Sequence, residues 1–172
     1  LDYAILAFEL THKYRNPVIL LADGYLGQMT GKVQLPDYMV KPGIPKWAVY
    51  GDRDHRRNLI TSIQLQEEDL ERFNQHLEDK YQAMKSEARA ESYLAADAEV
   101  VLVAGNTPAR AAKGSVKSLR EMGIKAGLFR PITIWPFPVA QLAALLPTAR
   151  HIVVVEANAG GQIEDELRLS MS

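Results

Sequence analysis

The stretch AEVVLVAGNTP, residues 98–108, contains the transition that decides the fold of this chain. Residues 98–104 are apolar except for Glu99 and rich in β-branched valine, which predicts a strand buried on both faces. Thr107 fits the N-cap of a helix and Pro108 fits its first helical position. A helix over residues 108–122 follows, and the glycine after it fits the C-terminal cap.

The same alternation continues to the end of the chain. It predicts two more buried strands and two more helices, over residues 124–129, 139–146, 151–155 and 162–169. Strand, helix and strand joined by short turns predict a parallel sheet with right-handed crossovers. The carboxyl ends of parallel strands meet at one edge, where this fold class binds ligands or partners. We therefore expect that edge to collect Gly105, Arg130, Glu156 and Asn158.

The first half of the chain has a different texture. An amphipathic helix over residues 4–14 and a buried strand over residues 18–22 predict the closing unit of another α/β domain. Frequent glycine and proline over residues 23–57 are typical of an inter-domain connection or of a loop packed on a partner. Residues 58–65 fit a short strand or an extended segment. Residues 67–90 show the longest helical pattern, with a narrow apolar stripe that suits a helix bridging domains or lying across a neighbour.

Charge and composition exclude several classes of function. The net charge is -1, which gives no indication of a nucleic-acid or anionic membrane partner. The apolar runs are too short to span a bilayer and no secretory signal is visible, so we expect a cytoplasmic protein. The chain has no cysteine and thus offers no thiolate nucleophile or iron–sulfur ligand. Both ends lie inside amphipathic patterns, which favours a piece cut from a longer protein.

Two turns at the expected sheet edge contain candidate binding residues. Gly105, Asn106 and Thr107 join a strand to a helix, and such a turn can bind anions through free backbone amides. The same turn is also the ordinary way to begin a helix, and without a glycine-rich phosphate motif we favour capping alone. Glu156 and Asn158 place a carboxylate and an amide in one turn, which holds a ligand or orders the turn; we favour the second.

The stretch RPITIWPFP, residues 130–138, is stiff and aromatic. Trp135 and Phe137 are interpreted as packing anchors against another domain or subunit in preference to ligand contacts, because rigid aromatic side chains dominate interface cores. Residues 52–57 form a mixed charge run with an Asp-x-Asp-His spacing, but its arginines would repel a cation, so a solvated or inter-subunit loop is favoured. No motif provides a catalytic group or a metal site.

Several stretches together resemble the alpha subunits of 2-oxoacid:ferredoxin oxidoreductases, especially the 3-methyl-2-oxobutanoate and 2-oxoglutarate types. They are AFEL, KYRNPV, ADGYLGQM, RNLITS, RPITIWPFP and VVEANAGGQ, at residues 7–10, 13–18, 22–29, 57–62, 130–138 and 154–162. They stand in the order of the family and cover nearly the whole chain. The fifth and the third are the more specific, whereas the family more often has a second asparagine where Ala157 stands.

The resemblance implies a division into parts. Residues 1–40 would be the end of a thiamine-diphosphate pyrimidine-binding α/β domain, residues 41–90 a connecting loop and long helix, and residues 91–172 a truncated parallel-sheet domain of the transketolase C-terminal type. The implied reaction is thiamine-dependent oxidative decarboxylation of a 2-oxoacid with coenzyme A, which gives an acyl-CoA and reduced ferredoxin.

The resemblance also implies that the chemistry lies elsewhere. The cofactor-activating glutamate would lie upstream of this chain, and the pyrophosphate–magnesium site and the 4Fe–4S clusters on other subunits. No catalytic or metal residue is therefore assigned here, and no cofactor-binding residue is assigned firmly. The weak candidates for cofactor binding are six residues at the sheet edge: Gly105, Asn106, Thr107, Arg130, Glu156 and Asn158. The chain's own role would be mainly structural, as a surface on which the beta and further subunits assemble. Coenzyme A and ferredoxin would be partners of the assembled complex.

Two other classes of function stay open at this point. One is a component of another thiamine-dependent enzyme, of the transketolase or 2-oxoacid dehydrogenase type. The other is a stand-alone, non-catalytic α/β module that binds a nucleotide or has a regulatory role.

Overall fold

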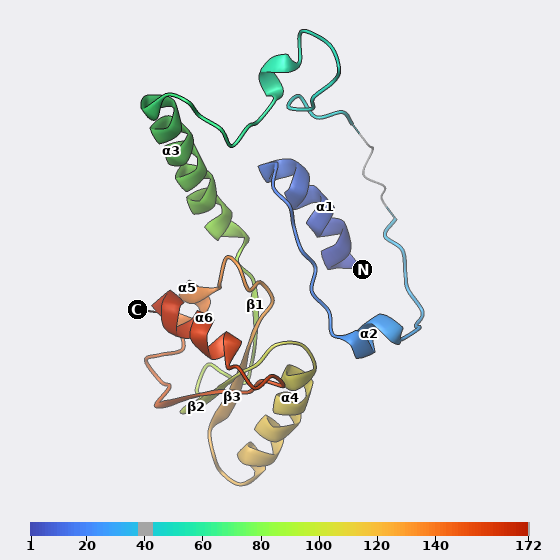
Figure 1. Cartoon of the computed structure of the whole chain (residues 1–172). Coiled ribbons are helices and arrows are strands. Elements are labelled where there is room, and N and C mark those ends of the chain that lie inside the picture. The colour runs from blue at the N-terminus through green and yellow to red at the C-terminus, as the bar shows by residue number, and fades with distance from the viewer. Residues whose placement is uncertain (38–42, 172) are drawn as a thin grey trace. The chain divides into compact units, whose positions relative to one another are not determined.

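The computed structural model describes residues 1–37 and 43–171 of the chain. The chain divides into two compact units, Leu1–Gln82 and Ala83–Ser172. Figure 1 shows that the second unit contains the sheet and that the first is made of helices and long connecting segments. Among the described residues, no helix is both long and apolar enough to cross a bilayer.

The second unit is built on a four-stranded sheet with the strand order β1-β3-β2-β4. β2 (Val100–Val103) pairs in parallel with β3 (Ala126–Pro131) on one side and with β4 (His151–Val154) on the other. The predicted parallel arrangement of these three strands is confirmed, with their bounds shifted by one or two residues. A fourth strand that the sequence pattern does not predict, β1 (Ala90–Tyr93), pairs antiparallel with β3.

Helices cover both faces of this sheet (Figure 1). α4 (Asn106–Glu121) packs on one face, and α5 (Val139–Ala143) and α6 (Gln162–Met171) pack on the other. Successive side chains of a strand point to opposite faces, so Leu102 joins the core under α4 while its neighbours join the core under α5 and α6. The apolar run at residues 98–104 is thus buried on both sides, as its composition predicts.

Gly127 allows a close backbone approach to the segment before β2. A Cβ at this position would lie 2.6 Å from the Cα of Ala95 and 2.7 Å from the carbonyl oxygen of Leu94, both backbone atoms. The guanidinium of Arg120 holds the approaching segment, because it donates to the Leu94 carbonyl at 2.7 Å and to the Asp97 carboxylate at 2.6 Å. Glycine is required here for space rather than for conformational freedom.

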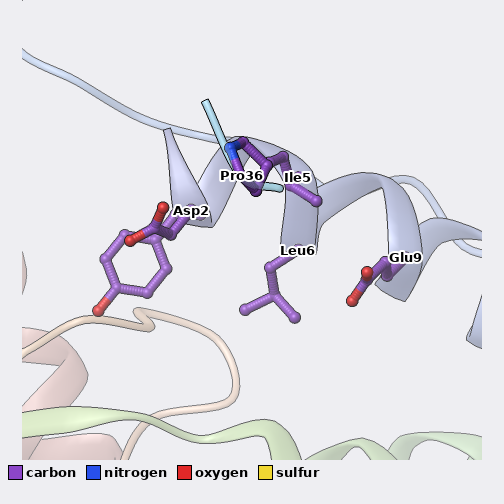
Figure 2. A pocket seen from close by; sticks show the side chains of 6 residues that line it. Asp2, Ile5, Leu6, Glu9 and Pro36 are labelled. Carbon is purple, nitrogen blue, oxygen red and sulfur yellow. The ribbon is translucent and has the colours of Figure 1, made fainter. Parts of the chain in front are cut away.

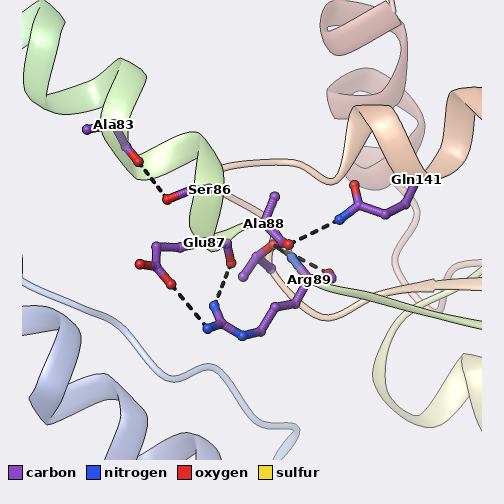
Figure 3. Close-up of polar contacts among 7 residues, drawn as sticks. Ala83, Ser86, Glu87, Ala88, Arg89 and Gln141 are labelled. Carbon is purple, nitrogen blue, oxygen red and sulfur yellow. Dashed lines mark hydrogen bonds and ion pairs between the residues drawn. The ribbon is translucent and has the colours of Figure 1, made fainter.

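Hydrogen bonds fix the segment that leads into β1 (Figure 3). The guanidinium of Arg89 donates to the backbone oxygen of Glu87 at 2.6 Å and to its carboxylate at 3.1 Å. The backbone N–H of Arg89 donates to the hydroxyl of Thr133 at 2.9 Å, and Gln141 Nε2 donates to the backbone oxygen of Ala88 at 3.2 Å. These bonds join the start of the unit to the loop after β3 and to α5.

In its described residues, the first unit holds three α-helices and one 3₁₀ helix: α1 (Asp2–Tyr14), α2 (Gly24–Gln28), η1 (Arg56–Asn58) and α3 (Glu67–Met84). α3 ends two residues into the second unit and continues as η2 (Lys85–Glu87). The end of α1 is tied to the loop around η1, since Arg15 donates to the backbone oxygen of Asn58 at 2.6 Å. Trp47 Nε1 also donates to the backbone oxygen of His12 at 3.2 Å.

Two predictions for the first half are corrected by the structure. Residues 18–22 form no strand, and Ile19 and Leu21 are 79% and 71% exposed. An extended apolar segment becomes a strand only when a neighbouring chain pairs with its N–H and C=O groups, and no described segment does so. The long helix ends at Met84 instead of residue 90, which belongs to β1. Residues 59–65 form neither helix nor strand, so of the two alternatives for this stretch the short strand is excluded.

Candidate functional site

The candidate site of the second unit is the edge where the parallel strands end. β2, β3 and β4 run in the same direction, so their carboxyl ends meet at one side of the sheet. Gly105 follows β2, Arg130 lies in the last two residues of β3, and Glu156 follows β4. The topology therefore brings these positions to one edge, as the alternation of strands and helices predicts.

Glu156 and Asn158 organise the turn between β4 and α6. Glu156 Oε1 accepts hydrogen bonds from the backbone N–H groups of Ile163 and Glu164, both at 3.0 Å. Its other carboxylate oxygen accepts from Asn158 Nδ2 at 2.6 Å, and Asn158 Oδ1 accepts from the backbone of Gly161 at 2.9 Å. The carboxylate therefore satisfies the first N–H groups of α6, as a helix cap does.

The ionisation of Glu156 follows from this position. Its partial burial would raise the pKa of the carboxyl, but hydrogen bonds from the Ile163 amide, from Asn158 and from the Glu164 amide outweigh that effect and lower the pKa. Hydrogen bonds to the charged form and the positive end of the α6 dipole both favour the anion. Glu156 is thus an ionised structural group whose oxygens are engaged inside the turn.

The start of α4 differs from the predicted cap. The helix begins at Asn106 with Gly105 as its N-cap, and no side chain makes the capping hydrogen bond. Thr107 lies inside the first turn instead of at the N-cap, so that assignment was wrong by two positions. Asn106 has a φ of 47°, in the left-handed region, where asparagine is one of the tolerated residues. This backbone turn explains the shift, because it lets the chain enter the helix before Thr107.

Arg130 contributes to a hollow of about 290 Å³ between the sheet and α4. Arg130 Nη1 donates to Glu91 Oε2 at 2.9 Å across the β1–β3 pair, where the two residues lie opposite each other. The hollow is lined by Glu91, Tyr93, Asn106, Ala109, Arg110, Lys113, Leu128 and Arg130. Of the six weak edge candidates, it brings together Asn106 and Arg130, whereas Gly105, Thr107, Glu156 and Asn158 are not among its lining residues.

The other residues that line this hollow were not predicted from the sequence as site residues. Arg110 and Lys113 carry the signature of a solvated helix face, and nothing in their spacing distinguishes them from Lys117 on the same helix. Glu91 and Tyr93 belong to β1, which is too short and too polar to be recognised as a strand. Only the pairing of β1 with β3 places these two side chains opposite α4.

The two aromatic side chains of the loop after β3 differ in burial. Phe137 is 8% exposed and belongs to the core under α5, so its ring is used inside its own domain. Trp135 is 58% exposed and Ile134 is 43% exposed. The exposed surface that an interface anchor needs is therefore provided by Trp135, and the predicted anchoring role is not carried by Phe137.

The first unit has its own hollow, of about 380 Å³, along α1 (Figure 2). It is lined by Asp2, Tyr3, Ile5, Leu6, Glu9 and Pro36. The polar side chains of its wall, Asp2 and Glu9, are acidic.

The charged loop at residues 52–57 is a separate feature. The Asp52 carboxylate accepts a hydrogen bond from the ring of His55 at 2.8 Å, and hydrogen bonds from the backbone and ring of His55 lower the pKa of Asp52. No group of three or more potential metal ligands occurs within residues 1–37 and 43–171.

Comparison with known proteins identifies similar sequences. Residues 98–172 match the family model described as pyruvate:ferredoxin oxidoreductase core domain II. The chain is 45% identical over 167 residues to the ketoisovalerate oxidoreductase subunit VorB of Methanothermobacter marburgensis, a match covering 95% of this chain and 47% of that protein. It is 31% identical over 188 residues to the 2-oxoglutarate synthase subunit KorA of Methanocaldococcus jannaschii, covering 92% of this chain and 50% of that protein.

A solved structure has a similar fold. It is the 2-oxoglutarate:ferredoxin oxidoreductase from Magnetococcus marinus, determined with 2-oxoglutarate, coenzyme A and succinyl-CoA bound. The match has a TM-score of 0.56 and 21% sequence identity, and covers 63% of this chain and 19% of that chain. The chain spans about half the length of the curated relatives that it matches.

Proposed function

We propose, from the match of residues 98–172 to the family model described as pyruvate:ferredoxin oxidoreductase core domain II, that this chain is part of the alpha subunit of a 2-oxoacid:ferredoxin oxidoreductase. The observation that carries the proposal is the 45% identity to a ketoisovalerate oxidoreductase subunit over 95% of this chain. The complete enzyme would convert a 2-oxoacid and coenzyme A into an acyl-CoA and carbon dioxide. The two electrons released would pass to ferredoxin.

The parts of the chain take their roles from the same similarity. Residues 91–172 are proposed to be a domain of the transketolase C-terminal type, and residues 1–40 the end of a pyrimidine-binding domain, with residues 41–90 as the connection. The exposed apolar segment at residues 18–22 agrees with a domain whose remaining strands belong to another part of the protein. That segment has the composition of a central strand of a parallel sheet.

The redox and thiamine chemistry is proposed to lie on other parts of the enzyme. This chain has no cysteine, so thiolate ligands for iron–sulfur clusters would have to come from other parts of the enzyme. In the described residues, the Glu156 carboxylate is engaged as the α6 cap, and within the charge run at residues 52–57 the Asp52 carboxylate accepts a hydrogen bond from the ring of His55. These donor sets do not fit a magnesium–pyrophosphate site, and we route no step of the reaction through them.

The chain's own contribution is proposed to be structural, through contacts with the other subunits. The exposed Trp135 on a proline-rich loop has the rigid, large apolar surface typical of interface anchors. Trp135→Ala in the complete subunit is expected to weaken assembly by about 2 kcal/mol or more, and Trp135→Phe to restore most of it. Unchanged complex formation by Trp135→Ala in sedimentation experiments would remove this residue from the interface.

An activity assay of the assembled enzyme tests the function itself. The complete subunit, purified with its partners, should reduce ferredoxin and form an acyl-CoA when given coenzyme A and either 3-methyl-2-oxobutanoate or 2-oxoglutarate. The preferred 2-oxoacid assigns the substrate. Ferredoxin reduction that requires neither coenzyme A nor any 2-oxoacid, or acyl-CoA formation with NAD as the only electron acceptor, would place the chain in another class of enzyme.

A further inference from the structure

The hollow between α4 and the β1–β3 pair concentrates positive charge on a concave surface. Arg110, Lys113 and Arg130 line it together with one carboxylate, that of Glu91, which leaves two positive charges in excess. We propose that this hollow binds the phosphate group of a small anionic ligand. The proposal rests on these side chains and does not depend on the proposed function.

The cations converge from two different elements. Arg110 and Lys113 are three residues apart in α4, so they lie on one face of the helix, beside the buried Ala109. Arg130 comes from β3, and its ion pair with Glu91 at 2.9 Å holds the guanidinium at the opposite wall. Charges presented from a helix and a strand surround a ligand in a way that a row of charges along one helix does not.

Arg110 and Lys113 keep their charges available for a ligand. Neither forms an ion pair with any carboxylate in residues 1–37 and 43–171, in contrast to Arg120 and Arg130 on the same unit. The ammonium of Lys113 lies 4.6 Å from the centre of the Tyr93 ring, which orients the side chain at the wall of the hollow. The aromatic ring stabilises this position without neutralising the cation.

The size of the hollow favours a small anion over an acidic protein surface. Its volume of about 290 Å³ is near the lower end of the range of about 300–1,000 Å³ common for small-molecule sites. Guanidinium and ammonium groups form short, charge-assisted hydrogen bonds with phosphate oxygens, and arginine does so with two donors at once. The hollow thus has both the dimensions and the donors for a phosphate or diphosphate group.

Calorimetric titration of the full chain with inorganic pyrophosphate and with ADP tests this inference. Lys113→Gln and Arg110→Gln should each weaken binding about tenfold, as expected for the loss of one charge-assisted hydrogen bond. Lys117→Gln is the matched control, because it removes the same charge one turn further along α4 and outside the hollow. The control should bind within about twofold of the unchanged chain.

The outcomes separate the sources of the phosphate. Tighter binding of ADP than of pyrophosphate assigns the hollow to a nucleotide-containing ligand, and equal binding assigns it to free phosphate or diphosphate; either result supports the inference. Absence of pyrophosphate and ADP binding at millimolar concentration would overturn it. An equal loss in Lys117→Gln and Lys113→Gln, or binding of a polyglutamate peptide without binding of pyrophosphate, would also overturn it in favour of a diffuse charged surface.

Discussion

Replacement of Glu156 tests whether the turn between β4 and α6 is a charged helix cap. Glu156→Ala leaves the N–H groups of Ile163 and Glu164 without their acceptor, which lies 3.0 Å from each nitrogen in the structure. Loss of a capping side chain costs about 0.5–2 kcal/mol. Loss of a negative charge at a helix N-terminus costs about 0.3–1 kcal/mol more. We therefore expect Glu156→Ala to lower the free energy of unfolding of the second unit by about 2 kcal/mol.

Glu156→Gln separates the hydrogen bonds from the charge. Glutamine keeps one carbonyl oxygen for the two amides but has no charge, so its cost should be about 1 kcal/mol. Urea unfolding followed by circular dichroism measures both variants against the unchanged chain. Glu78→Gln, at an exposed position in the interior of α3, makes the same chemical change away from the helix ends and serves as the control.

The stabilisation by Glu156 should depend on pH in a direction that follows from its lowered pKa. Hydrogen bonds lower the pKa of Glu156 in the folded state, so the unfolded chain binds a proton more readily there than the folded chain does. The stabilisation is therefore complete above the unfolded pKa of glutamate, about 4.3, and is lost as the pH falls through the lower folded value. The difference between the unchanged chain and Glu156→Gln should shrink over that acidic range. A difference that is constant with pH would refute the charged cap.

Three further tests, two of them with a matched control variant, have definite expected outcomes in urea or protease experiments. Gly127→Ala should destabilise the second unit by about 2 kcal/mol because its Cβ would meet backbone, whereas Gly114→Ala, with open space around it in α4, should stabilise by up to about 1 kcal/mol. Phe137→Ala should cost about 3–5 kcal/mol, and Trp135→Ala should stay within about 1 kcal/mol, because only the first ring lies in the core. Asn58→Ala removes two 2.9 Å bonds to backbone carbonyls of its loop and should cost about 1–2 kcal/mol, seen as faster proteolysis of that loop. Equal stability of the two glycine variants, a mild Phe137→Ala, or unchanged proteolysis would each contradict the corresponding reasoning.

The fold of the second unit was largely predictable because its signals are local. Continuous apolar runs bounded by glycine and proline mark β2 and β3, and the helix between them has a strong amphipathic pattern. β1 was not predicted because its sequence, AESY, has no apolar run and becomes a strand only by pairing with β3. The strand predicted at residues 18–22 was wrong for the opposite reason. Its composition signals burial, but composition says nothing about which chain provides the partner.

The candidate site was less predictable than the fold. Parallel topology explains why Gly105, Arg130 and Glu156 reach one edge, and this followed from the order of the elements. The positively charged hollow could not be foreseen, because Arg110 and Lys113 look like ordinary solvated residues until Arg130 is placed opposite them. Contacts between elements distant in sequence decide such sites, and periodicity carries no information about them.

The central position of β2 in the sheet has a consequence for the exchange of amide hydrogens with solvent. β2 has a hydrogen-bonded neighbour on each side and helices over both faces, whereas β1 and β4 each pair with one strand among the described residues. Fraying of an edge can release amides of β1 or β4, but those of β2 exchange only when the whole unit opens. Deuterium should therefore enter β4 and β1 first, and the slowest amides of β2 should report the global stability of the unit.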